Sequence, residues 1–238
     1  MIKLVADLFT QDECDSAINE ITQSQHLWTS CLDTDMYVLG NSFLRNQNNN
    51  YLVNNIYNFK TVELFREKVS VLFQKEVRFC HSLAKPGFQV VNRKGSKNPC
   101  VWHYDTVLLK YPYNIEFPDY DAFDTYFENY YVLGLMLTSG QSSFDYFQAT
   151  ESEFVNTTAT SETPLCNNHH DLVGDDCGNP DCKLTEFQTL QYQQGALLIQ
   201  TKKILHRIGY ADIDGSDHQR MTLQAYAVVK DDIMYLFW

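Results

Sequence analysis

The sequence predicts an α+β domain in which N-terminal helices flank a β-sandwich or jelly roll. Helical periodicity is confined to about the first 84 of the 238 residues, and short runs of β-branched and aromatic residues follow it. The length fits a single domain, with a jelly-roll core over about residues 85–230. Hydrophobic residues make up 44% of the chain and aromatic residues 14%, which is typical of a globular protein with a substantial core.

Two helices are expected in the N-terminal part. The first spans residues 10–24, where Thr10 and Glu13 form a capping-box pattern that satisfies backbone N–H groups at the start of a helix. The second spans residues 61–74. Both carry apolar side chains at helical spacing, which predicts one buried face each. These are Cys14, Ala17, Ile18 and Ile21 in the first helix, and Val62, Phe65, Val69, Leu72 and Phe73 in the second.

Strands are expected after the turn signal Lys85-Pro86-Gly87. Between residues 149 and 194 the composition changes to Ser, Thr, Asn, Asp, Gly, Pro and Cys without clear periodicity. A stretch of this length inside a compact domain is either a functional insertion or a partly mobile segment. The runs that predict strands are residues 88–92, 131–137, 196–200 and 221–229.

Charge and hydropathy argue against two classes of partner. The net charge is −12 and the pI is near 4.9, so nucleic acid is not expected, because phosphate binding draws on clustered Lys and Arg. No apolar run approaches a membrane span, and Asp7 interrupts the N-terminus too early for a signal-peptide core. We therefore expect a cytoplasmic protein without a membrane partner. The seven cysteines are an odd number and mostly scattered, which favours reduced thiols.

His103, Asp105 and His206 indicate a metal site. Residues 101–107 alternate in character, so an extended segment would project His103 and Asp105 from one face toward the same ion. His206 follows the apolar run at 196–200, and a strand there would supply a third ligand. Two imidazoles and one carboxylate suit one face of a divalent ion such as Fe(II) and leave three coordination positions open. Taken singly, each motif also fits a hydrogen-bonded pair or a core histidine.

Arg220 and Thr222 lie two residues apart on the last predicted strand and therefore share a face. A guanidinium offers a planar fork of donors, and a hydroxyl beside it completes a cradle for a carboxylate, such as that of a dicarboxylate cosubstrate. Arg220 alone fits a salt bridge equally well. The order of the motifs along the chain, His-X-Asp, a distal His and then Arg-X-Thr, favours a common site.

In this order of motifs the chain resembles the Fe(II)- and 2-oxoglutarate-dependent dioxygenases, whose pattern is His-X-Asp, a distal His and then Arg-X-Ser or Arg-X-Thr. The resemblance covers roughly residues 85–230 and implies a double-stranded β-helix, the cupin-like form of the jelly roll. It also implies that His103, Asp105 and His206 hold iron, and that Arg220, assisted by Thr222, binds the distal carboxylate of 2-oxoglutarate. Asp105 and His206 are further apart in this sequence than in compact members. The second half of the core looks especially similar, at Gln194-Gly195-Ala196-Leu197-Leu198-Ile199, His206-Arg207-Ile208-Gly209 and Arg220-Met221-Thr222-Leu223-Gln224.

The resemblance further implies an activity. 2-Oxoglutarate and O2 would be consumed, succinate and CO2 formed, and a C–H bond of the substrate hydroxylated. Related halogenating enzymes replace the carboxylate ligand with a small residue, so the presence of Asp105 favours hydroxylation.

The segment from residue 111 to residue 131 directly follows the first metal-ligand pair and mixes acidic with aromatic side chains. Carboxylates and aromatic faces both attract a cation, so we expect a small cationic substrate such as a basic free amino acid. A packed aromatic surface with solvated acids explains the same residues. Its acids include Asp119, Asp121, Asp124 and Glu128.

A second metal is suggested by Cys166, His169, Cys177 and Cys182, which offer the four ligands of a tetrahedral structural zinc. The spacing of Cys166 and His169 is acceptable, but that of Cys177 and Cys182 is wider than in most zinc knuckles. An acidic, solvated loop is the alternative.

Two other functions are compatible with the sequence. One is a protein or peptide hydroxylase, in which the acidic segment receives a basic side chain of a polypeptide. The other is a non-catalytic jelly-roll module that uses the Cys/His insertion to contact a partner. Arg220 and Thr222 argue against the module, since it has no need of a dicarboxylate cradle. The sequence does not indicate the oligomeric state.

Overall fold

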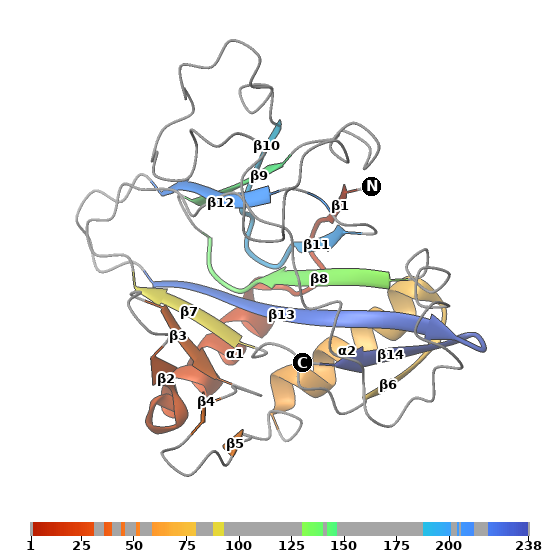
Figure 1. Cartoon of the computed structure of the whole chain (residues 1–238), viewed down its shortest axis with the longest axis horizontal. Helices are drawn as coiled ribbons and strands as arrows, with labels where there is room; N and C mark the ends of the chain where they lie inside the picture. The colour runs from red at the N-terminus through yellow and green to blue at the C-terminus, as the bar shows by residue number, and fades with distance from the viewer. Residues whose placement is uncertain are drawn as a thin grey trace.

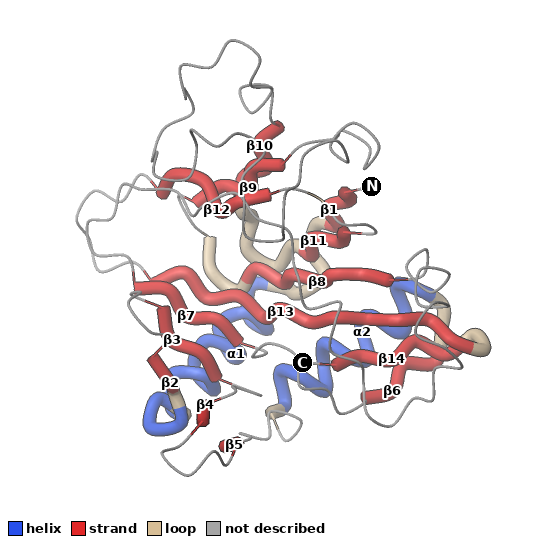
Figure 2. The backbone as a smooth tube through the Cα atoms, viewed as in Figure 1, coloured by secondary structure: helices blue, strands red, loops and turns tan. Residues whose placement is uncertain are grey.

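The computed structural model describes residues 2–30, 36–39, 44–45, 51–52, 59–79, 88–92, 130–139, 142–146, 188–200, 204, 206–211 and 219–237. Figure 1 shows a larger sheet with two helices against it and a smaller sheet beside it, and Figure 2 shows the same elements as a tube. No described helix has the length and apolar character needed to cross a membrane.

The larger sheet, which we call the major sheet, has nine strands within the described ranges. Seven run in the order β1-β11-β8-β13-β7-β3-β2, β14 also pairs with β13, and β6 pairs with β14. All neighbours are antiparallel except β14 and β6. The strands are β1 (Ile2–Val5), β2 (Thr29–Ser30), β3 (Met36–Leu39), β6 (Glu76–Phe79), β7 (Phe88–Asn92), β8 (Tyr130–Met136), β11 (Leu197–Gln200), β13 (Gln219–Lys230) and β14 (Ile233–Phe237).

The smaller or minor sheet is antiparallel and has the order β10-β9-β12. Its strands are β9 (Ser142–Tyr146), β10 (Gln188–Gln191) and β12 (His206–Ala211). A separate hairpin pairs β4 (Leu44–Arg45) with β5 (Tyr51–Leu52). The helices are α1 (Gln11–Gln23), the short 3-10 helix η1 (Gln25–Leu27) and α2 (Lys60–Phe73).

The two faces of the major sheet have different neighbours. On β13, Met221, Leu223 and Ala225 are buried with apolar side chains of α1 and α2, which form the main core. On the opposite face, Met136 of β8 and Leu198 of β11 pack with side chains of the minor sheet. The period-two alternation of strands therefore separates a helix-facing core from a face that looks toward the minor sheet.

Both predicted helices are confirmed. α1 begins after Thr10, whose hydroxyl accepts from the Glu13 backbone N–H at 3.3 Å, while the Glu13 carboxylate accepts from the Thr10 N–H at 2.7 Å. α2 ends at Gln74, which adopts a left-handed conformation. The four predicted strands correspond to β7, β8, β11 and β13 within one or two residues at each end.

Two expectations need correction. The N-terminal part is not only helical, because β1 to β6 lie among its helices. The last residues of the predicted insertion are also regular structure, since Gln188–Gln191 form β10 against β9. The alternation in both regions covers only two to four residues at a time, too few to give a periodic signal.

A carboxylate of α1 caps the N-terminus of α2. Phe59 precedes α2 and provides no side-chain cap. Instead the Glu20 carboxylate accepts from the backbone N–H groups of Lys60 and Thr61, both at 2.9 Å, and from the Thr61 hydroxyl at 2.6 Å. A negative charge at this end also complements the helix dipole. Glu20 therefore fixes the two helices to each other as well as completing α2.

The substitution Glu20→Ala should lower the free energy of unfolding by about 1–2 kcal/mol, because it leaves N–H groups at the start of α2 without their acceptor. Chemical denaturation monitored by circular dichroism measures this loss. The control is Glu67→Ala at an exposed position of α2, which should change stability by less than about 0.5 kcal/mol. Equal effects of the two substitutions would show that Glu20 is not a cap.

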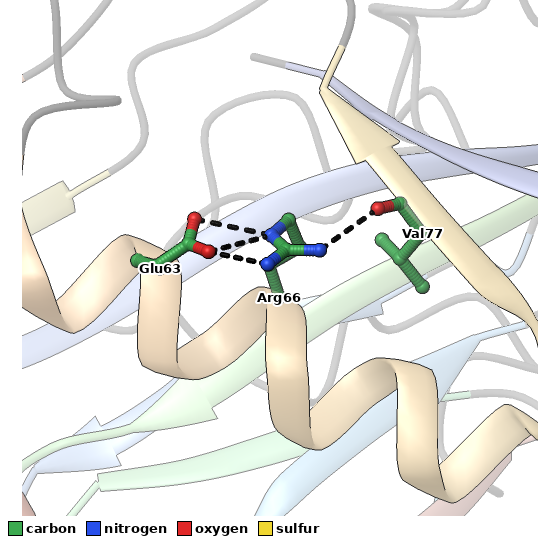
Figure 3. A network of polar contacts seen from close by, with 3 residues as sticks. All are labelled: Glu63, Arg66 and Val77. Atoms are coloured by element: carbon green, nitrogen blue, oxygen red, sulfur yellow. Dashed lines mark hydrogen bonds and ion pairs between the residues drawn. The ribbon is translucent and has the colours of Figure 1, made fainter.

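Arg66 joins α2 to the edge strand β6 (Figure 3). Its guanidinium donates to the Glu63 carboxylate one turn earlier and, through Nη1, to the Val77 carbonyl oxygen at 3.2 Å. The hydrogen bond from Arg66 holds the pKa of the Glu63 carboxyl below its usual value. The parallel pair β14–β6 is thus fastened to the helix that covers it.

Gly195 occupies a position that no other residue fills without strain. It has φ +77°, its N–H donates to the Met136 carbonyl at 2.8 Å, and its carbonyl accepts from the Phe9 N–H at 3.0 Å. A Cβ there would lie 2.1 Å from the Phe9 carbonyl oxygen.

The Cys14 thiol is buried beside Gly195. Burial raises the pKa of this thiol to about 11, so the thiol is protonated at neutral pH.

Gly195→Ala should destabilise the protein by roughly 2–5 kcal/mol, since a left-handed alanine costs about 1–2 kcal/mol and an overpacked contact about 1–3 kcal/mol. Gly134→Ala on β8 is the matched control. Its Cβ would meet only ordinary contacts, at 3.6 Å from Met136 and 3.9 Å from Leu198. The control should change stability by less than about 1 kcal/mol. Thermal unfolding of the two variants tests the prediction, and similar melting temperatures would contradict it.

Candidate functional site

His206 opens β12 and faces the major sheet. It pairs with Tyr146 across the strands, is 5% exposed, and stacks on the Phe144 ring with 4.9 Å between centroids and 21° between planes. Its Nδ1 lies 2.8 Å from the Ile204 carbonyl oxygen. A carbonyl only accepts, so Nδ1 donates to it, and in the neutral imidazole the lone pair is then on Nε2. This is the orientation in which metal-binding histidines are usually held.

Thr222 borders the same group of side chains as His206. It is buried on β13 and lies opposite Met136 of β8, and directly opposed residues of paired strands share a face. Met136 belongs to the same packed cluster as Phe144, on which His206 stacks. We call the five buried side chains at this place the interior cluster, formed by Met136, Phe144, Tyr146, Tyr192 and Leu198.

Arg220 reaches the interior cluster through Tyr192. Its Nη1 donates to the Tyr192 hydroxyl oxygen at 3.2 Å, and its Cζ lies 5.3 Å from the centroid of the tyrosine ring. Because Arg220 and Thr222 are two residues apart on β13, they extend from the same face of the major sheet. The fold thus brings His206, Thr222 and Arg220, which come from two different sheets, to the border of one cluster.

An ion pair lies on the other face of the minor sheet, directly behind His206. Arg207 Nε is 3.0 Å from Asp145 Oδ2, and the two side chains are only 3% and 4% exposed. The second carboxylate oxygen of Asp145 accepts from the Ser143 hydroxyl at 3.0 Å and from the Thr189 hydroxyl at 2.9 Å. These contacts join all three strands of the minor sheet and hold the register that points His206 inward.

This polar group is not predicted from the sequence. Its only signal is the alternation Ser143-Phe144-Asp145-Tyr146, in which polar and aromatic residues take turns. That alternation predicts a short strand, but not that the polar face is buried, nor that its partners come from 44 and 62 residues further along the chain.

Asp145→Ala should destabilise the protein by about 3–5 kcal/mol, because it leaves the Arg207 charge buried without its carboxylate. The matched control is Glu76→Ala, which breaks the exposed pair between Glu76 and Arg78 on β6 and should leave the melting temperature unchanged. Differential scanning calorimetry of both variants measures the contrast. A small effect of Asp145→Ala would show that the ion pair does not organise the minor sheet.

Several predicted site residues lie outside the described ranges. They include His103 and Asp105 of the predicted iron triad, the four predicted zinc ligands Cys166, His169, Cys177 and Cys182, and the acidic residues of the aromatic segment. Their roles stay predictions. Of the residues predicted for iron and cosubstrate, the structure describes His206, Arg220 and Thr222, and it gathers these three.

The described residues fit the groups predicted for them. A buried imidazole with its proton held on Nδ1 presents Nε2 as a metal ligand, and a guanidinium beside a hydroxyl suits a carboxylate. Met136, Phe144 and Leu198 provide an apolar environment, in which a contact between a guanidinium and a carboxylate is stronger than in water.

No protein-family model matches this sequence, and comparison with curated proteins finds no match. Solved structures are similar in fold. The epimerase SnoN in complex with Fe³⁺, α-ketoglutarate and nogalamycin RO is 11% identical, with a TM-score of 0.50 over 94% of this chain and 78% of SnoN. HygX from Streptomyces hygroscopicus with nickel, 2-oxoglutarate and hygromycin B bound is 12% identical, with a TM-score of 0.47 over 94% of this chain and 82% of HygX. The likeness to SnoN, at a TM-score of 0.50, shows that this chain shares the fold of that protein.

Proposed function

We propose that this chain is a non-haem Fe(II)- and 2-oxoglutarate-dependent oxygenase that hydroxylates a C–H bond of a small, cationic, amine-bearing substrate such as a free amino acid. Succinate and CO2 are the co-products. The observation that carries the proposal is the convergence of His206, Thr222 and Arg220 on the interior cluster. The shared fold with SnoN, which is described as a non-haem, α-ketoglutarate-dependent epimerase, supports the use of the same metal and cosubstrate.

In this proposal His103, Asp105 and His206 hold the iron, which when bound activates O2 at the expense of 2-oxoglutarate. The hydrogen bond from His206 Nδ1 to the Ile204 carbonyl and the stacked Phe144 ring keep the imidazole in one orientation. Arg220 and Thr222 bind the distal carboxylate of the cosubstrate. The apolar side chains of the interior cluster exclude water from this contact.

The cationic substrate is inferred from the acidic and aromatic residues between positions 111 and 131. SnoN is an epimerase, so the mass of the product must be measured as well as its amount. Hydroxylation adds one oxygen atom to the substrate, whereas epimerisation leaves the mass unchanged. Incubation with separate pools of free amino acids and of basic peptides distinguishes the small-molecule activity from peptide hydroxylation.

The test is succinate formation from 2-oxoglutarate by protein loaded anaerobically with Fe(II) and then supplied with O2 and a substrate pool. His206→Ala should lower turnover by at least about 100-fold, since loss of a ligand exceeds the effect of losing a residue that supports one. Arg220→Ala should raise KM for 2-oxoglutarate by about 10-fold or more, because charged hydrogen bonds contribute about 1.5–3 kcal/mol.

The matched controls are His26→Ala on η1 and Arg78→Ala on β6, both exposed and neither on a strand that contributes to the interior cluster. Both should retain wild-type turnover. If the wild-type protein binds neither Fe(II) nor 2-oxoglutarate, the oxygenase proposal is wrong.

A further inference from the structure

Tyr192 belongs to the interior cluster and also contacts Arg220, the cationic side chain predicted to bind the cosubstrate. It lies just after β10 and is 8% exposed. The cluster around it includes the buried side chains of Met136, Phe144 and Leu198. Its hydroxyl oxygen accepts from Arg220 Nη1 at 3.2 Å. The ring is thus fixed by apolar packing while its polar end meets the guanidinium.

We propose that Tyr192 is a positioning residue for Arg220, and that it sets the affinity of the site for the distal carboxylate of the cosubstrate. This inference rests on the proposed function. Nothing in the sequence pattern of His-X-Asp, distal His and Arg-X-Thr assigns a role to Tyr192, which falls inside the stretch predicted as an insertion.

The physical reason is the flexibility of arginine. A free arginine side chain loses about 2 kcal/mol of rotamer entropy when it is fixed, and a ligand that must fix it binds more weakly by that amount. The Tyr192 oxygen and the ring 5.3 Å from Cζ restrict the guanidinium before any ligand arrives. The fork of Arg220 is therefore pre-organised for a carboxylate on the face that Thr222 shares.

Isothermal titration calorimetry of 2-oxoglutarate into the Mn(II)-loaded protein tests the proposal without catalysis. Tyr192→Phe removes only the oxygen and keeps the ring in the interior cluster, so the fold should be retained, which thermal unfolding checks. We expect the Kd for 2-oxoglutarate to rise about 10-fold, the loss of one hydrogen bond to a charged group. The affinity for Mn(II) itself should stay the same.

The matched control is Tyr235→Phe on β14. The Tyr235 hydroxyl also lies beside an arginine, Arg78, but on the far edge of the major sheet. Its loss should leave the Kd for 2-oxoglutarate unchanged. In the Fe(II) enzyme, Tyr192→Phe should raise KM for 2-oxoglutarate while kcat at saturating cosubstrate is retained, a division that general loss of structure does not produce.

A second arm measures coupling. Arg220→Lys keeps the charge but not the planar fork, so in that background Tyr192→Phe should raise the Kd by less than 2-fold. If wild-type protein binds 2-oxoglutarate and Tyr192→Phe binds it equally well, the role of Tyr192 is wrong and the proposed function stands. Equal effects of Tyr192→Phe in both backgrounds would also overturn it. If wild-type protein fails to bind 2-oxoglutarate, the proposed function and this inference are both wrong.

Discussion

The structure depends above all on the alternation of side chains along β13. This strand pairs with β7, β8 and β14, so each of its residues has a partner strand on at least one side. One face of it supplies Met221, Leu223 and Ala225 to the core beneath the helices. The other face carries Arg220 and Thr222 toward the minor sheet. A shift in register by one residue would exchange the two faces, so core packing and the position of the cosubstrate residues are set by the same pairing.

The minor sheet is held together by polar contacts instead, because its strands are short and the face turned away from the major sheet is polar. Asp145 and Arg207 form a buried ion pair on this face, and the Ser143 and Thr189 hydroxyls donate to the same carboxylate. A buried ion pair contributes less to stability than apolar packing of similar size, but it tolerates few alternative arrangements. Here one arrangement matters, since Arg207 is the residue after His206. The direction of the Arg207 side chain thus fixes that of the histidine on the other face.

Local patterns were sufficient to predict the helices and the longer strands. The capping box at Thr10 and Glu13 and the apolar run of β13 each carry their signal within one segment. The minor sheet was not predicted as a sheet, because β9, β10 and β12 are short and their partners lie far apart in the chain. The proposed role of Tyr192 could not be predicted from the sequence for the same reason. It depends on the hydrogen bond from Arg220, which lies 28 residues away in the chain. Motif order located His206, Arg220 and Thr222, whereas their common neighbours emerged only from the fold.

The most direct test of this account is a crystal structure of the protein with Mn(II) and 2-oxoglutarate, grown without oxygen. We expect the metal at about 2.1 Å from His206 Nε2, an ordinary distance between imidazole nitrogen and a divalent ion. The distal carboxylate should lie on Arg220 and Thr222, at the border of the interior cluster. Metal bound elsewhere, or a cosubstrate whose distal carboxylate makes no contact with Arg220, would show that these residues do not form one site.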